Sequence, residues 1–150
     1  MDMKSPQLHL RFVPDTDQTG ELFVHAESEG FAGAASAWFH FREIREFGVL
    51  LTARCPLPPG ETLTLKGGYW ETGTQRPRLE ETLVGLTVYA VGTTGTMAVS
   101  VELMDGTYEG QRKASRAQVR LEILTDCSTL RTFGEAIAGL VQGGERTVGL

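Results

Sequence analysis

Seven segments of the chain are predicted to be β-strands, and in most of them apolar and polar residues alternate, the pattern of a strand with one buried face. The clearest segment spans residues 83–91, where Val84, Leu86 and Val88 share one face. The other predicted strands span residues 8–12, 22–26, 31–39, 62–69, 97–103 and 119–123. Short turns separate several of these segments, so antiparallel pairing is expected.

Two segments have the spacing of an amphipathic helix. Near residues 42–53, the apolar positions follow i, i+3, i+4 and i+7, and they are Ile44, Phe47, Gly48 and Leu51. Near residues 128–142, a second apolar stripe begins at Leu130 and follows Asp126 or Ser128, either of which can cap the helix. Residues 145–150 are predicted to form a loose tail.

These elements predict one α+β domain over residues 1–150. Its expected core is a largely antiparallel, twisted sheet of about seven strands, with both amphipathic helices packed on one face. The 150 residues are 41% hydrophobic and 22% charged, which is ordinary for a globular protein.

The formal net charge of −5 limits the expected partners. An acidic chain repels phosphate backbones, so nucleic-acid binding is not expected, whereas a basic protein partner would be attracted. No apolar stretch approaches the about 20 residues that cross a membrane, and the first residues lack the apolar region of a signal peptide. No membrane partner is therefore predicted, and the oligomeric state is left open.

The two cysteines, Cys55 and Cys127, are 72 positions apart and fit no zinc-type spacing. We interpret them as free, buried thiols in a reducing compartment. Together with the absence of a signal peptide, this interpretation predicts the cytoplasm.

Residues with catalytic or metal-binding chemistry are present but have no recognisable spacing. His9, His25 and His40 lie on predicted strands or strand ends, and they lack the close ligand pairs typical of zinc sites. Nucleophile and phosphate-loop motifs are absent, and Gly67-Gly68 is better explained as a β-bulge or a tight bend. The sequence therefore predicts no catalytic residue, metal or cofactor, and a protein that is not an enzyme.

The best candidate binding edge lies around the end of the fourth predicted strand. Trp38 and Trp70 are each either core residues or interface anchors, because a large aromatic side chain serves both roles. Glu80 and Glu81 are adjacent on a strand and point to opposite faces, so they form a poor acid–base pair and a better solvated edge. The predicted partner-binding residues are Tyr69, Trp70, Glu71, Glu80 and Glu81.

The order of these parts resembles the WapI family of bacterial immunity proteins. The resemblance includes the helix at residues 42–51, the Gly67-Gly68-Tyr69-Trp70 strand end, the hairpin at residues 92–95 and a closing strand–helix unit with Leu130 and Phe133. It implies a stoichiometric inhibitor that folds alone and covers the functional surface of a cognate toxin. The acidic charge suits a basic toxin domain.

Two other function classes stay open. A small-ligand-binding or regulatory domain would use an open face of the sheet as a concave apolar pocket. An enzyme of unfamiliar type would need His25, His40 or the acidic residues to converge in a cleft.

Overall fold

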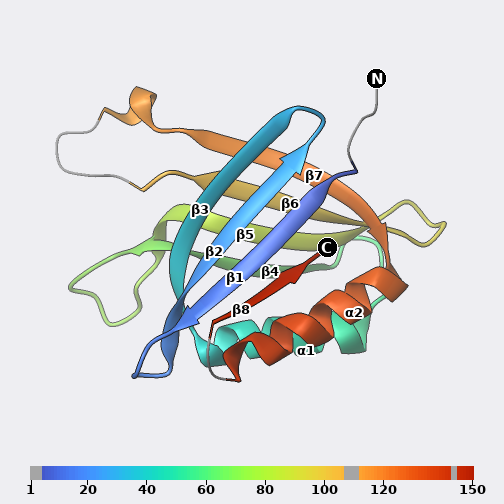
Figure 1. Ribbon diagram of the computed structural model, residues 1–150, viewed down its shortest axis with the longest axis horizontal. Coiled ribbons are helices and arrows are strands. Elements are labelled where there is room, and N and C mark those ends of the chain that lie inside the picture. The colour runs from blue at the N-terminus through green and yellow to red at the C-terminus, as the bar shows by residue number, and fades with distance from the viewer. Residues whose placement is uncertain (1–4, 107–111, 143–144) are drawn as a thin grey trace.

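The computed structural model describes residues 5–106, 112–142 and 145–150. In this part of the chain, eight strands form two antiparallel sheets (Figure 1). Sheet A has the order β3-β2-β1-β8 and sheet B the order β4-β5-β6-β7. The strands are β1 Gln7–Pro14, β2 Thr19–Ser28, β3 Phe31–His40, β4 Thr62–Trp70, β5 Leu79–Val91, β6 Thr96–Met104, β7 Gln118–Asp126 and β8 Arg146–Gly149.

The α+β class and the antiparallel pairing are confirmed, whereas the prediction of a single seven-stranded sheet is wrong. The chain leaves β3 directly into helix α1, Phe41–Arg54, and returns as β4, which pairs with β5 and not with β3. Each sheet has one apolar face, and the two faces bury each other, as in a sandwich. The strands of sheet A cross in front of those of sheet B in Figure 1.

The predicted loose tail is also wrong. Residues 146–149 form β8, which pairs with β1 so that Val148 lies opposite Leu10. The backbone N–H of Leu150 donates to the carbonyl of Leu8 over 2.8 Å. Val148 and Leu150 pack against the core, so a short segment that is too brief to show a strand pattern still covers an edge of sheet A.

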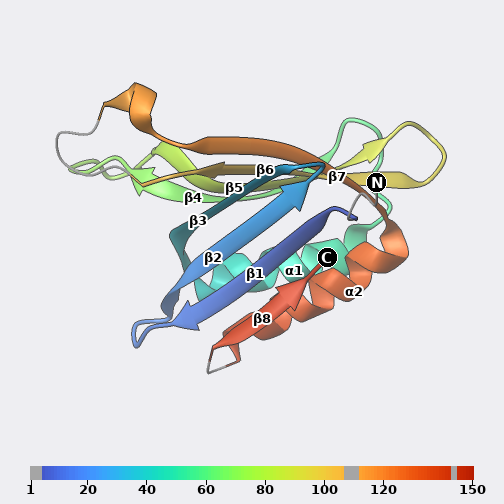
Figure 2. The ribbon, with the colours of Figure 1, turned by 45° about the horizontal axis from the view of Figure 1, so that its top comes forward.

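The two helices lie side by side along one flank of the molecule (Figures 1 and 2). Helix α2 spans Cys127–Ala138, with Asp126 as its N-cap, and a short 3₁₀-helix, Gly139–Val141, follows it. Helix α1 contacts β3 and β4, whereas α2 contacts β7 and β8. The helices therefore bridge the two sheets and do not cover one face of a single sheet, which corrects the prediction. Their apolar stripes join one hydrophobic cluster with both sheets.

The interpretation of Cys55 and Cys127 as free thiols is wrong, because the two form a disulfide bond with Cα atoms 5.6 Å apart. Cys55 follows α1 and Cys127 begins α2, so helix packing brings together residues that the sequence separates by 72 positions. Disulfides are typical of oxidising compartments. The cytoplasmic location stays a prediction, but its argument from free thiols no longer holds.

Candidate functional site

Strand β3 is an edge of sheet A, and its free edge is the centre of the candidate site. The β2–β3 hairpin turns through two residues, Glu29 and Gly30, both with positive φ (52° and 86°). In such a hairpin the flanking pair, Ser28 and Phe31, exchanges backbone hydrogen bonds, and every second pair beyond it does the same. The register therefore directs the backbone groups of the alternate residues away from β2: Ala32, Ala34, Ser36 and Trp38.

Three hollows follow this free edge from end to end. The largest, about 800 Å³, is bordered by residues 34–38 of β3 and by Tyr69 and Leu83 of sheet B. A second, about 310 Å³, shares Ala34 and Asp105 with the first. The third, about 510 Å³, shares Trp38 with the first and has Trp70 and Pro77 on its other side. Because the hollows share lining residues, we treat them as one surface, the β3 groove.

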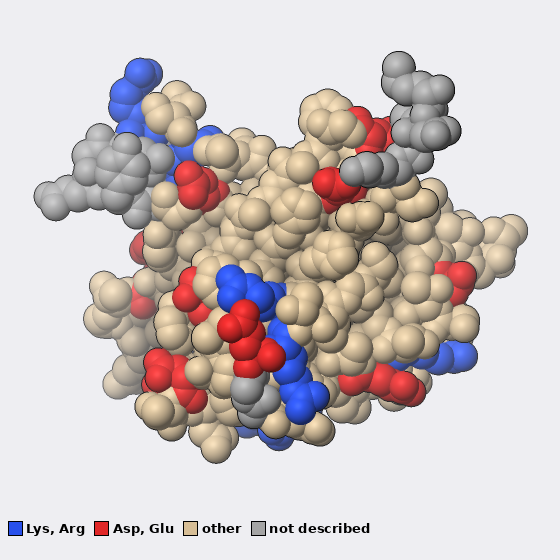
Figure 3. Space-filling view, viewed as in Figure 1, with Lys and Arg blue, Asp and Glu red and all other residues tan. Residues whose placement is uncertain are grey.

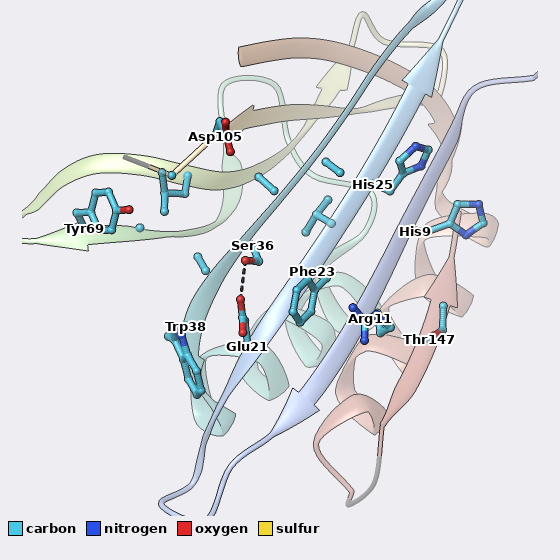
Figure 4. Close-up of a pocket in the computed structure, with 17 residues that line it drawn as sticks. His9, Arg11, Glu21, Phe23, His25, Ser36, Trp38, Tyr69, Asp105 and Thr147 are labelled. Atoms are coloured by element: carbon cyan, nitrogen blue, oxygen red, sulfur yellow. Dashed lines mark hydrogen bonds between the residues drawn. The ribbon is translucent and has the colours of Figure 1, made fainter. Parts of the chain in front are cut away.

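The largest hollow also extends over the outer face of sheet A. There Arg11 lies over the Phe23 ring, 4.1 Å from its centroid, and forms a 2.7 Å ion pair with Glu145. The Ser36 hydroxyl donates to Glu21 over 2.6 Å (Figure 4). These contacts hold the polar side chains beside the groove in place. None of them involves the backbone edge of β3.

The three histidines do not converge. His9 and His25 are paired across β1 and β2 and line the largest hollow. His40 precedes α1, where its backbone N–H donates to Glu43 Oε1 over 3.0 Å, and it lines the hollow beside Trp70. Among the described residues, no group of three or more His, Cys, Asp or Glu side chains is placed to hold a metal ion.

The structure places two of the predicted binding residues, Tyr69 and Trp70, in the lining of the groove. The predicted bulge at Gly67-Gly68 is confirmed, and a second register shift separates Tyr69 from Trp70. As a result, Tyr69 lines the largest hollow and Trp70 the one beside Pro77. Glu71 follows in the β4–β5 loop, where its carboxylate accepts the N–H of Arg78 over 3.3 Å.

The two other predicted residues lie elsewhere. Glu81 forms a 2.9 Å ion pair with Arg116, whose side chain is only 6% exposed and also donates to the carbonyl of Asp105. This contact ties the connection after β6 to β5, so Glu81 has a structural role. Glu80 is exposed and lines a separate hollow with Glu102 and Arg120.

Both tryptophans are exposed, Trp38 at 54% and Trp70 at 46%, so the interpretation of them as core residues is wrong. They lie on different sheets, yet they line the same hollow. The sequence does not predict this pairing, the free edge of β3 or the position of Asp105, because the alternation pattern does not determine the order of strands in space. The small residues at positions 32–37 of β3 are the signal in the sequence that another element could approach this strand closely.

The groove is acidic. Its lining includes the carboxylates of Glu21, Glu43 and Asp105. Among the described residues that line it, Arg11 is the one lysine or arginine, and it already pairs with Glu145. Beside it, a hydrogen bond from the Thr19 side chain lowers the pKa of Asp17, because the bond favours the charged carboxylate. The face seen in Figure 3 is otherwise mostly uncharged, with acidic and basic side chains interspersed and no large area of one sign.

Comparison with known proteins finds no matching family, curated protein or solved structure. The resemblance to the WapI family therefore stays a prediction. Within the described ranges, neither helix is both long and apolar enough to cross a membrane.

Proposed function

We propose that this chain is a non-catalytic protein-binding module, and that it acts as a stoichiometric inhibitor of a bacterial toxin, as immunity proteins do. One observation carries the proposal: Trp38, Tyr69 and Trp70 are exposed and line one continuous groove. Large aromatic side chains dominate the binding energy of protein interfaces, because they bury much area and lose little conformational entropy.

The shape of the groove supports a protein partner over a small molecule. Small-molecule sites enclose most of their ligand, so their lining residues are largely buried. Several lining residues of the largest hollow, His9, His25, Ala34 and Trp38 among them, are instead exposed. A broad, open surface of this kind suits a macromolecule that brings its own apolar surface.

The inhibitor role rests on charge and on the sequence resemblance. The chain has a net charge of −5, and the groove itself is acidic. These features complement a basic toxin domain, and such complementarity raises association rates. An inhibitor that covers a functional surface needs no catalytic residues of its own.

The test is photo-crosslinking in cells of the native organism. Trp38 is replaced by the photoreactive amino acid p-benzoylphenylalanine, and a matched variant carries it at Leu124, which is 58% exposed on the outer face of sheet B. We expect one protein to be captured from position 38 and not from position 124. Expressed alone, that protein should arrest growth, and co-expression of the wild-type chain should restore it.

Three outcomes would contradict all or part of the proposal. Identical capture from both positions would mean that the groove is not the binding surface. A captured protein that does not arrest growth would exclude the inhibitor role while leaving the binding role. If nothing is captured and native mass spectrometry shows a bound small molecule, the ligand-binding alternative replaces the proposal.

A further inference from the structure

The free edge of β3 differs from the other surfaces of the groove, because it presents backbone hydrogen-bonding groups. The hairpin register directs the N–H and C=O groups of Ala32, Ala34, Ser36 and Trp38 into the groove. Within the described part of the chain, no backbone hydrogen bond is found for these groups on that side. An unpaired strand edge is a template for another strand.

Proteins usually protect such an edge with proline, charged side chains or a bulge. Strand β3 has none of these between Phe31 and Phe39, and its pairing with β2 is regular throughout. Beneath the edge, Tyr69 and Leu83 of sheet B form a floor, and Trp38 and Trp70 stand at one end. The groove is thus open along the edge of β3. Its floor and the two tryptophans could contact the side chains of an added strand.

We propose that the β3 groove binds an extended, basic segment of the partner protein, which adds to sheet A as a fifth strand beside β3. This inference rests on the proposed protein-binding function and names how the partner is held. Backbone hydrogen bonds from the four alternate residues supply affinity, and the hollows accept every second side chain of the segment. From residue 32 to residue 38, the edge is about 20 Å long, which accommodates about six residues.

Charge determines the kind of segment. The groove lining carries Glu21, Glu43 and Asp105, and Asp105 borders two of the three hollows. Lysine or arginine side chains of an added strand would lie within reach of these carboxylates. A basic segment is therefore favoured over an acidic one, and its binding weakens as salt screens the attraction.

A second copy of this chain does not fit the same edge in antiparallel pairing. A strand placed against β3 has its inner face covered by the floor around Tyr69 and Leu83. The β3 of a second copy already has that face packed on its own sheet B, where Gly33 lies against Val119. The two sheets B would occupy the same space, so the occupant is a segment without a second layer beneath it.

The experiment begins with a phage-displayed library of random 12-residue peptides, selected on the wild-type chain at low salt. An enriched peptide is synthesised and measured against a matched pair of variants, Ala34→Pro and Ala34→Val. Both change the same outward side chain, but only proline removes the N–H that faces the groove. We expect Ala34→Pro to weaken binding about tenfold, which corresponds to the loss of about one hydrogen bond, and Ala34→Val to retain most of the affinity.

Amide hydrogen exchange supplies a signature that ordinary surface binding does not give. In the free chain, the amides of Ala32, Ala34, Ser36 and Trp38 should exchange quickly. On peptide binding they should become protected together. Methylating the alternate backbone nitrogens of the peptide that face β3 should abolish binding, because it removes their N–H donors. Methylating the other alternate set, which faces solvent, should leave binding intact.

Each result separates this inference from the proposed function. Enriched peptides without protection of the four amides would overturn strand addition, as would equal binding by both variants or the absence of any enriched peptide. Concentration-dependent protection in the free chain would overturn it in favour of a second copy. In all these cases, a partner crosslinked at position 38 would still support the binding function. Protection of the four amides without any toxic partner would refute only the inhibitor role.

Discussion

At the scale of single residues, solvent exposure distinguishes side chains that are available to a partner from side chains that stabilise the core. Trp38 and Trp70 lie on different sheets and expose about half of their surface, 54% and 46%. A core tryptophan would be nearly fully buried, and its removal would leave a large cavity. These two residues are therefore positioned for a partner at little cost to the fold.

Replacing Trp70 by alanine should weaken binding of the partner or of a groove peptide while leaving the free energy of unfolding within about 0.5 kcal/mol of wild type. Trp38→Ala should behave in the same way, because its indole borders the same hollow. Binding is measured by isothermal titration calorimetry and stability by urea unfolding. A loss of several kcal/mol in stability would instead assign the tryptophan to the core.

Asp126 makes the stability of the chain depend on pH. Its carboxylate accepts the backbone N–H of Thr129 over 2.8 Å at the start of α2, and this hydrogen bond lowers the pKa of Asp126 below its ordinary value of 3.8. A lowered pKa in the folded state stabilises the fold above the ordinary pKa, and the contribution is lost as pH falls through the folded value. Asp126→Asn still caps the helix but does not titrate.

The stability difference between wild type and Asp126→Asn should therefore favour wild type near neutral pH and shrink below about pH 4. Urea midpoints of both proteins between pH 7 and pH 2.5 measure it. A difference that stays constant across this range would show that the carboxylate has no special role in the folded state.

At the scale of elements, the two helices approach each other at a pair of glycines. A Cβ atom on Gly48 would lie 2.5 Å from the backbone of Gly134 and Ala138, and one on Gly134 would lie 2.7 Å from the carbonyl of Gly48. Backbone atoms cannot move aside as a flexible side chain can, so the helices pack closely only because both positions lack a side chain. The helical spacing predicted Gly48 on the buried face, but not that it meets Gly134.

Gly48→Ala should destabilise the fold by about 1–3 kcal/mol, because the added methyl group forces α1 and α2 apart. The matched control is Gly139→Ala, since a Cβ there meets nothing within 4 Å and φ is negative. That control should be neutral or slightly stabilising. Equal effects of the two substitutions on the urea midpoint would indicate that helix propensity, and not the close contact, determines the result.

The sequence predicted these elements much better than their arrangement. All seven predicted strands and both helices exist, because alternation and helical spacing are local properties of the chain. The division into two sheets depends on which strand β4 pairs with, and β8 depends on a partner, β1, at the other end of the chain. For the same reason Tyr69 and Trp70 were found as candidates, whereas the free edge of β3 was not.

At the scale of the whole molecule, function and stability lie on different parts of the fold. The β3 groove lies along the free edge of sheet A, whereas the disulfide and the paired glycines hold the two helices together. The helices in turn contact strands of both sheets, so they fix the angle at which sheet A crosses sheet B. The floor of the groove belongs to sheet B and its edge to sheet A, and the helix pair therefore maintains the groove from a distance.

The disulfide between Cys55 and Cys127 should contribute to the stability of the helix pair. It closes a segment with a sequence separation of 72, and a loop of that length should stabilise the folded state by about 2–4 kcal/mol through the reduced entropy of the unfolded chain. Dithiothreitol should lower the urea midpoint of wild type accordingly and leave that of Cys55→Ala/Cys127→Ala unchanged. Iodoacetamide should label neither cysteine of the unfolded, unreduced protein. Two labelled thiols, with no effect of the reductant, would instead support the first interpretation of both residues as free thiols and would restore the argument for a reducing compartment.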